Sequence, residues 1–514
     1  MKSAESFTGR AAVRGVRWSL AAVLARQGFQ MVCAIVLARL LGPESYGIIS
    51  AATIYVTLTG LFLDQGLSAA LIQNASVTRR AAGATATLNL AVSVALGAAT
   101  VFLAPAVAGF FRADAVALLL LPLAASIPLK ALAITPRAML SRELLLHHVA
   151  RADIAGAAIG AAAGVAAAFL GAGYFALAYQ VLATDVVTAV LLLAASRGPA
   201  PNIHLGEVRP LLAFSLSVFV TNCLAYFSRN VDNILVGRVL GVASLSLYSM
   251  AYRIMVIPIQ LVGQTVNRIM FPAFSRAADD PARLAEHLRT STQVVAMMVV
   301  PAMAYVACAA PALVHLVLGN AWLPAAGIIS VLAIGGARET IFYVTPSLMK
   351  GLGKGNLIIR YELLAAALQV GGIVAGLQFG LFWVAVGLVA GGLALVPVLL
   401  AIQSRLTGLR IRQQLAVIWP PIHGALWGSA AYLGLALLGW SAFPTAAAGL
   451  GAFLVVDAAV LSIVHRNHLR PFLGHARTLF SRQRAALDDP QHAPARQASS
   501  AHGNARDGAA HDGR

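Results

Sequence analysis

Polar residues inside a long apolar stretch of the chain are the first candidates for chemistry. Tyr226, Arg229 and Asn233 follow one another at intervals of three and four, so a helix places them on one face, with Asn222 one turn earlier. Guanidinium groups form paired hydrogen bonds with phosphate, and side-chain amides can bind sugar hydroxyls. This face therefore predicts a site for an anionic, hydroxyl-rich ligand, although Arg229 and Asp232, at i and i+3, also fit a plain ion pair.

A second set of polar residues lies in two other apolar stretches. Arg253, Gln260 and Gln264 fall close to one stripe of a helix, and Arg26 lies in the first apolar stretch, beside Gln27 and Gln30. An ionisable residue deep in a membrane helix costs at least about 2.5–3.5 kcal/mol, so each should face protein or a water-filled cavity. The candidate substrate-binding residues are Arg26, Asn222, Arg229, Asn233, Arg253, Gln260 and Gln264.

Three acidic residues in apolar stretches, Asp64, Asp232 and Glu339, are candidates for coupling transport to an ion. For Asp64 the alternative is a cap at the start of a kinked half-helix. Glu339 adjoins Arg338, which favours a local ion pair instead.

Arg39 and Arg238 stand apart from this candidate site. Each lies at the end of an apolar stretch, three residues before a glycine turn at Gly42 or Gly241. Long basic side chains at such positions extend toward the membrane surface or hold the turn in place. A structural role is therefore expected for both arginines.

The composition defines the class of protein. Of 514 residues, 59% are hydrophobic and only 11% charged, with a mean hydropathy of +0.80, so the apolar surface must face lipid. The formal charge of +18 lies at helix borders and in the tail without a nucleic-acid-reading motif, so nucleic acid is not an expected partner. Cys33, Cys223 and Cys308 lie inside apolar runs and lack the spacing of a disulfide framework or zinc site. No metal or cofactor is expected.

The apolar stretches are expected to form an all-α membrane protein of about fourteen transmembrane helices, since a helix needs about 20 mostly apolar residues to cross the bilayer core. Lys and Arg accumulate in short cytoplasmic loops. Six alternate connections hold fifteen of them, whereas the other seven hold only Arg39, Arg112 and Arg238, which places both termini in the cytoplasm. The expected spans are 16–38, 47–72, 84–110, 115–136, 149–170, 173–195, 210–237, 244–270, 290–318, 325–349, 356–377, 382–403, 416–439 and 444–465.

An internal repeat organises the spans into two halves. A shift of 199 residues aligns Ile35–Gly42 with Ile234–Gly241, and Ser50 with Ser249. The paired spans run in the same direction, so we expect parallel repeats about an axis along the membrane normal, with the polar cavity between them. The expected organisation is a cytoplasmic segment 1–15, a six-helix bundle 16–195, a cytoplasmic linker 196–209, a second six-helix bundle 210–403, two added helices 404–465 and a basic, largely disordered cytoplasmic tail 466–514.

Three motifs carry a resemblance to a known family. They are Arg39-Leu-Leu-Gly-Pro-Glu-Ser-Tyr-Gly47, Asp64-Gln-Gly-Leu-Ser-Ala-Ala-Leu-Ile72 and Asn230-Val-Asp-Asn-Ile-Leu-Val-Gly-Arg-Val-Leu-Gly241. Over about residues 10–465 the chain resembles the polysaccharide biosynthesis/export family of lipid-linked oligosaccharide flippases. That family belongs to the multidrug/oligosaccharidyl-lipid/polysaccharide exporter superfamily.

The resemblance implies a fold of two six-helix bundles around a V-shaped central cleft, here with two added C-terminal helices. It also implies a bacterial inner-membrane transporter, not an enzyme. Such a protein flips undecaprenyl-pyrophosphate saccharides from the cytoplasmic to the periplasmic leaflet by alternating access, for O-antigen, capsule or exopolysaccharide synthesis. The implied partners are the lipid-linked oligosaccharide, membrane lipids, a polysaccharide polymerase and a chain-length regulator. Among the candidates, the resemblance favours Arg26, Arg229 and Arg253 for the pyrophosphate.

Two other functions remain open. A proton- or sodium-coupled multidrug exporter would share the fold, but cationic drugs favour an acidic cavity, whereas arginine is at least as frequent as Asp and Glu in these spans. A membrane glycosyltransferase or polymerase needs a catalytic loop or domain outside the membrane. No connection between the expected spans is long enough to form one.

Overall fold

A computed structural model describes residues 2–64, 67–73, 78–196 and 201–466, and the regular structure in these ranges is all helical, with no strand. The expected all-α class is therefore confirmed for them, and the expected tail beyond Arg466 lies outside the described residues. The helices are α1 (Lys2–Asp64), α2 (Leu67–Gln73), α3 (Arg79–Phe111), α4 (Asp114–Ala124), α5 (Ser126–Arg142), α6 (Leu146–Phe169), η1 (Gly173–Phe175), α7 (Ala176–Ala195), η2 (Leu205–Val208), α8 (Arg209–Pro258), η3 (Ile259–Gly263), α9 (Gln264–Arg276), α10 (Pro281–Val317), η4 (Asn320–Trp322), α11 (Ala325–Phe342), α12 (Thr345–Gly351), α13 (Gly355–Leu377), α14 (Leu381–Ala394), α15 (Val396–Thr407), α16 (Ile411–Ala436) and α17 (Ala442–Ile463).

Ten helices in the described ranges are long and apolar enough to cross a membrane, or eleven if the bent pair α4 and α5 forms one span. The multi-pass membrane architecture is thus confirmed, while the number fourteen remains a prediction. Two of the ten, Arg26–Leu63 and Arg229–Arg276, each cover parts of two expected spans in one long element. The helix α16, which covers the expected span 416–439, is not among the ten.

Each of these two long elements is broken at a glycine. Gly42 in α1 has φ 74° and ψ 174°, and Gly241 in α8 has φ 83° and ψ 173°. This combination is essentially restricted to glycine, because a Cβ atom would clash with the backbone there. The two glycines lie 199 residues apart, so the same rare backbone geometry recurs at positions that the sequence repeat makes equivalent.

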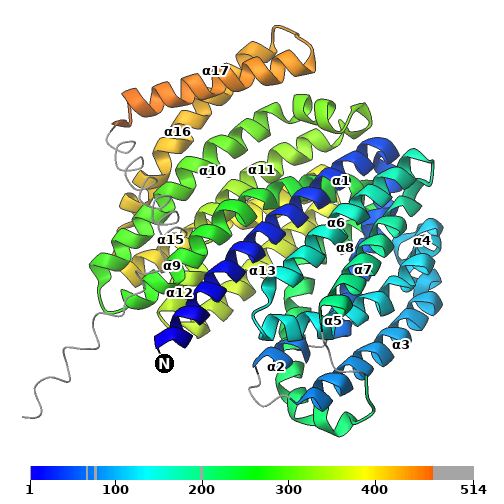
Figure 1. Cartoon of the computed structure of the whole chain (residues 1–514). Coiled ribbons are helices and arrows are strands. Elements are labelled where there is room, and N and C mark those ends of the chain that lie inside the picture. The colour runs from blue at the N-terminus through cyan, green and yellow to red at the C-terminus, as the bar shows by residue number, and fades with distance from the viewer. Residues whose placement is uncertain (1, 65–66, 74–77, 197–200, 467–514) are drawn as a thin grey trace, which may run out of the picture.

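The helices lie on either side of α1, which runs through the middle of the molecule (Figure 1). The helices α3, α5 and α7 are on one side, and α9, α10 and α12 are on the other. At the far edge, α16 and α17 pack against each other and against α10. The hydroxyl of Tyr305 in α10 donates to the carbonyl of Ala446 in α17 at 2.8 Å, which helps to attach this last pair.

The buried core is continuous at one end of the helices and divided at the other. At the end near the two glycine breaks, one cluster joins residues of both sequence halves, including Tyr46, Phe111, Leu245 and Trp322. No further cluster of described residues joins the two halves, although one includes Val208 of the linker and another includes residues of the added helices α16 and α17. The two halves therefore share a buried core near the breaks. Away from it, the hydroxyl of Tyr226 donates to the carbonyl of Ile54 at 2.6 Å, and the rings of Phe62 and Phe219 lie 5.1 Å apart.

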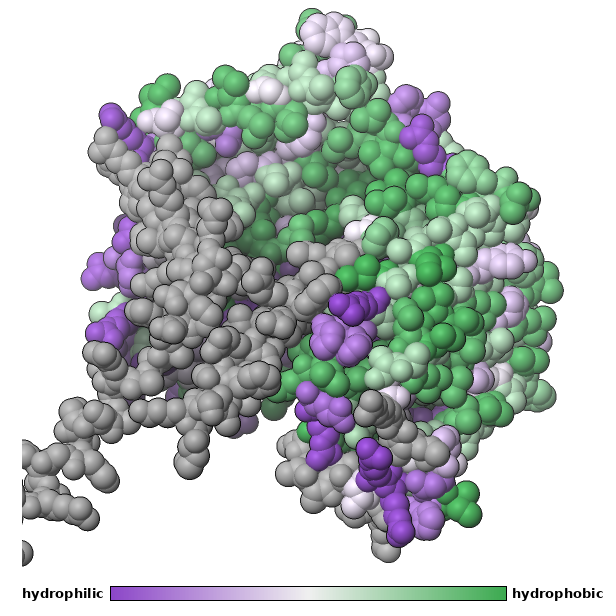
Figure 2. All heavy atoms as spheres, in the orientation of Figure 1, coloured by the Kyte–Doolittle hydropathy of each residue, from purple (hydrophilic) through white to green (hydrophobic). Residues whose placement is uncertain are grey.

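The outer surface suits contact with lipid. Figure 2 shows apolar side chains over much of the visible face, with fewer hydrophilic ones, which gather in its lower part and at the left edge. Large side chains such as Phe102, Phe169 and Leu437 are exposed. Such extensive apolar exposure would be costly in water and is expected in a bilayer.

Candidate substrate-binding site

A cavity of about 750 Å³ lies between the first part of α1 and the later part of α8, and α10 and α11 complete its wall. Its polar lining consists of Gln27, Gln30, Tyr252, Arg253 and Gln260. The remainder of the lining is apolar apart from one glycine, Gly28. Among the described lining residues there is one cationic side chain and no acidic one. The cavity is thus suited to an anionic group with hydroxyls and an adjoining apolar part.

Local helix geometry directs these groups to a common space. Gln27, Gln30 and Ala34 follow at intervals of three and four, so α1 presents them on one face. Arg253 lines the cavity from α8. Gln260 lines it from the π-helical segment η3, which begins directly after Pro258. A π turn widens the helix and changes the direction of the residues that follow, and such turns are frequent at functional sites.

The structure separates the predicted site residues into two groups. Arg253 and Gln260 line the cavity. Arg26 in α1 and Gln264, the first residue of α9, are exposed but lie outside its lining. Asn222 and Arg229 are exposed on the part of α8 before the break and are also outside the lining. The remaining predicted residue, Asn233, is buried.

Asn233 is directed toward a carboxylate instead of the cavity. Its backbone N–H and its side-chain amide both donate to Oδ1 of Asp232, at 2.8 and 3.1 Å. The other carboxylate oxygen accepts a hydrogen bond of 2.9 Å from the hydroxyl of Tyr248. Asp232 is only 4% exposed, so these donors take the place of the water molecules that would bind its carboxylate in solution. The alternative partner Arg229 makes no ion pair with Asp232 among the described contacts.

A pair of tyrosines connects this buried carboxylate to the cavity. The ring of Tyr248 stacks on that of Tyr252, with centroids 6.1 Å apart and planes at 28°, and Tyr252 lines the cavity. The sequence analysis did not identify either tyrosine. The signal was available, because Asp232 and Tyr248 lie nine residues before and seven residues after Gly241, where a broken helix brings its two arms together.

The other two acidic candidates differ in their surroundings. Glu339 on α11 is half-buried and interacts electrostatically with Arg338, Glu362 and Arg229. Arg229 is far from Glu339 in the sequence, and the two form no ion pair among the described contacts. Asp64 is the last residue of α1, and its side chain lies outside the described part of the structure.

The site contains no group of the kind that holds a metal. Within the described residues, no three His, Cys, Asp or Glu side chains are grouped so that they could hold an ion. The lining residues offer hydrogen bonds, one positive charge and apolar contact to a ligand. Together with the membrane-spanning fold, this defines a multi-pass membrane protein with an internal ligand cavity, the class to which transporters belong.

Comparison with known proteins identifies the family. Residues 36–327, more than half of the chain, match the model of the family described as polysaccharide biosynthesis protein. The protein belongs to this family. It is 22% identical over 428 residues to the lipopolysaccharide biosynthesis protein WzxC of Escherichia coli (strain K12), covering 80% of this chain and 85% of the relative. It is 26% identical over 365 residues to the succinoglycan biosynthesis transport protein ExoT of Rhizobium meliloti (strain 1021), covering 71% and 74%.

Solved structures show the same fold. The lipid II flippase MurJ in an inward closed conformation superposes with a TM-score of 0.69 at 13% identity, over 88% of this chain and all of that one. An inward-facing multidrug resistance MATE family transporter of the MOP superfamily gives a TM-score of 0.60 at 17% identity, over 76% and 96%. At these identities the likeness concerns the fold alone.

Proposed function

We propose that this protein is a flippase that moves lipid-linked saccharides from the cytoplasmic to the periplasmic leaflet of a bacterial inner membrane. The observation that carries the proposal is the cavity lined by Arg253 and three glutamines, in a member of the polysaccharide biosynthesis family. Relatives named for lipopolysaccharide biosynthesis and succinoglycan transport support a polysaccharide precursor as the cargo. In chemical terms, the cargo is a prenyl pyrophosphate that carries a saccharide.

The lining residues divide the recognition of such a molecule. Arg253 supplies a permanent cation with several N–H donors, which suits the pyrophosphate. Gln27, Gln30 and Gln260 offer amide donors and acceptors that suit sugar hydroxyls. Met31, which is 45% exposed, also lines the cavity, so an apolar chain can lie against its wall while remaining in lipid.

The division of the core supports alternating access as the mechanism. The halves share a core near Gly42 and Gly241 and have separate cores toward the other end. The alternation of basic loops assigns that other end to the cytoplasm, with both termini on the same side. In the proposed cycle, the two six-helix bundles form a V that opens to the cytoplasm, binds the headgroup and then closes there while opening outward. The two added helices accompany the second bundle.

Three carboxylates are the proposed sites of coupling to an ion gradient. Asp232 is linked to the cavity through Tyr248 and Tyr252, so a change in its charge state alters a hydrogen bond one residue away from the wall. Glu339 interacts electrostatically with Arg229, and this offers a second, more open location. Asp64 is the third candidate, from the sequence alone.

The competing function of a multidrug exporter fits the cavity less well. Cationic drugs are stabilised by acidic side chains, and the described lining provides a guanidinium instead. The MATE likeness concerns the fold and leaves the cargo open. A polymerase and a chain-length regulator are proposed as the partners that act on the product after translocation.

Replacement of Arg253 tests the proposal. In a strain that lacks the native gene, Arg253→Gln should reduce surface polysaccharide at least about tenfold, because a charge-assisted hydrogen bond to phosphate contributes about 1.5–3 kcal/mol. Arg276→Gln, at the exposed end of α9, is the matched control and should leave polymer at the normal level. Normal polymer from a well-expressed Arg253→Gln protein would argue against this cavity as the transport site.

A further inference from the structure

Two arginines outside the cavity bind the ends of helices that belong to the opposite half of the chain. Nη1 of Arg39 donates to the carbonyls of Leu316 and Val317, the last turn of α10, at 2.8 and 3.3 Å. Nη1 of Arg238 donates to the carbonyl of Phe110, in the last turn of α3, at 3.0 Å. The guanidinium of Arg238 also lies 5.3 Å from the centroid of the Phe110 ring.

The two contacts are reciprocal. Arg39 and Arg238 are 199 residues apart, which is the offset of the sequence repeat. Arg39 lies in the first half and reaches a helix of the second, whereas Arg238 lies in the second half and reaches a helix of the first. This is the pattern of a two-fold interface, in which each side contributes the same group to the other. The sequence analysis expected each arginine to extend toward the membrane surface or to hold its own turn. In the structure, each arginine also binds a helix of the other half.

The chemistry of a helix end explains why an arginine is placed there. The last carbonyls of a helix have no intrahelical partner and carry a partial negative charge, so a cationic donor stabilises them. A guanidinium that reaches from the other half gives this stabilisation only while the two halves are close together. This stabilisation is therefore lost whenever the halves separate at this end.

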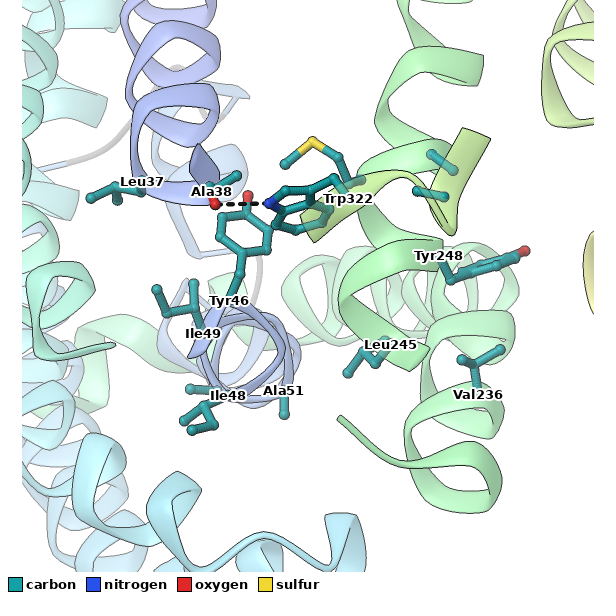
Figure 3. Packing of buried hydrophobic residues seen from close by; sticks show 14 of the residues in the cluster. Leu37, Ala38, Tyr46, Ile48, Ile49, Ala51, Val236, Leu245, Tyr248 and Trp322 are labelled. Carbon is teal, nitrogen blue, oxygen red and sulfur yellow. Dashed lines mark hydrogen bonds between the residues drawn. The ribbon is translucent and has the colours of Figure 1, made fainter. Parts of the chain in front are cut away.

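A buried tryptophan makes another polar contact between the halves at the same end. The indole N–H of Trp322, in the short helix η4 of the second half, donates to the carbonyl of Ala38 in the first half at 2.9 Å. Figure 3 shows this bond, with the ring of Tyr46 edge-on to the indole; the two centroids are 5.6 Å apart. Trp322 is fully buried, so water does not compete for the bond.

We propose that Arg39 and Arg238 are gating residues, a reciprocal pair of latches that holds the external end of the transporter shut while the cavity faces the cytoplasm. Both latches release when the halves separate at this end. The proposal rests on the proposed transport cycle for its place in function. Its structural content, two bonds that keep this end closed, can be measured without any substrate.

A cysteine behind the latches reports whether this end is open. Cys33, Cys223 and Cys308 are first replaced by alanine, and Ser50→Cys is introduced as the reporter. Ser50 is half-buried in α1 beyond the Gly42 break, and its hydroxyl contacts Ser249 of the other half. In spheroplasts, the rate of labelling by a membrane-impermeant maleimide then measures access from the external side.

Removal of the donors should open this end more often. We expect Arg39→Met and Arg238→Met each to increase the labelling rate about two- to fivefold, and the double variant about five- to twentyfold. Arg39→Lys and Arg238→Lys keep a cationic donor and should restore much of the protection. Arg112→Met is the matched control, because Arg112 directly follows α3 at the same end, is exposed, and is not part of either latch.

The labelling rates test the latch independently of the proposed transport function. Faster labelling in the double methionine variant, with unchanged labelling in Arg112→Met, supports the latch whether or not polymer export is affected. Labelling at the control rate in both single variants and in the double variant would overturn it. If the double variant does not accumulate, the comparison of each single variant with its lysine counterpart gives the same decision.

Discussion

Ser50 in α1 and Ser249 in α8 meet at the interface between the two halves, with their hydroxyl oxygens 3.0 Å apart. They are equivalent positions of the 199-residue repeat. In a two-fold arrangement, a residue meets its own equivalent only near the axis. The pair therefore marks where the pseudo-two-fold axis crosses the interface, and the reciprocal arginine contacts are arranged about it.

A disulfide at this pair should arrest transport. In the background without native cysteines, Ser50→Cys and Ser249→Cys place two thiols where the hydroxyls are now in contact, within reach of a disulfide bond. Oxidation should reduce surface polymer to about the level of the deletion strain, because the external end can no longer open. Reduction should restore export, and either single cysteine should be insensitive to the oxidant. Continued export from fully cross-linked protein would contradict a moving interface.

Close packing next to the break predicts a second effect. A Cβ atom at Gly47 in α1 would overlap the backbone carbonyl of Val242, which directly follows Gly241 in α8. Gly47→Ala must therefore push the two halves apart, and we expect a loss of about 1–3 kcal/mol in stability. Thermal unfolding of the purified protein in detergent measures the effect.

The same helix provides the control for that substitution. Gly60 lies in the interior of α1, and a Cβ atom at this position would meet no neighbouring atom within 4 Å. Gly60→Ala should therefore be neutral or raise stability by about 0.4–1 kcal/mol. Equal unfolding temperatures for the two alanine variants would show that the halves do not press together at Gly47.

Much of the architecture could be predicted from the sequence, because the bilayer imposes long apolar helices and the repeat relates the two halves. The backbone geometry of Gly42 and Gly241 and the contact of Ser50 with Ser249 agree with that repeat. The partners of Arg39 could not be predicted, since its acceptors are 277 and 278 residues away and are backbone atoms, which leave no mark in the sequence.

The candidate site was harder to predict than the fold. Periodicity placed Arg229 and Asn233 on one face of a straight helix, but which way a face points depends on how that helix packs. The break in α8 brings Tyr248 back to Asp232, and Asn233 joins that cluster instead of the cavity. Arg253 and Gln260 lie beyond the break and line the cavity, whereas Gln264, expected on the same stripe, does not.

The glutamines of the cavity should affect recognition of the sugar more than of the phosphate. We expect Gln30→Leu and Gln260→Leu each to weaken binding of a lipid-linked saccharide about two- to tenfold, because a neutral hydrogen bond contributes about 0.5–1.5 kcal/mol. Binding of the prenyl pyrophosphate without sugar should be unchanged in these variants. Arg253→Gln should weaken binding of both ligands.

Binding assays with purified protein and the two ligands separate these roles. Gln378→Leu, at the exposed C-terminal end of α13, is the matched control and should bind both ligands normally. If the leucine variants lost affinity for the sugar-free ligand as strongly as for the saccharide, the assignment of the amides to the sugar would be wrong.

The hydrogen bond from Tyr248 to Asp232 gives the last prediction. Tyr248→Phe keeps the buried ring but removes one of the donors that compensate the carboxylate for its lost solvent. A buried polar group that loses its partner costs about 1–3 kcal/mol, so thermal stability should fall by this amount. Tyr252→Phe, which keeps the stacked pair of rings and does not alter the bond to Asp232, should have a smaller effect.

A double-mutant cycle then assigns the loss to this one bond. If Asp232 carries a charge that needs the hydroxyl, Asp232→Asn should make the protein less sensitive to Tyr248→Phe, and the two effects should not add. Export measured in the same variants separates structure from coupling. A coupling residue loses transport in Asp232→Asn even when the protein is stable, whereas additive stability losses with normal export would remove Asp232 from the proposed mechanism.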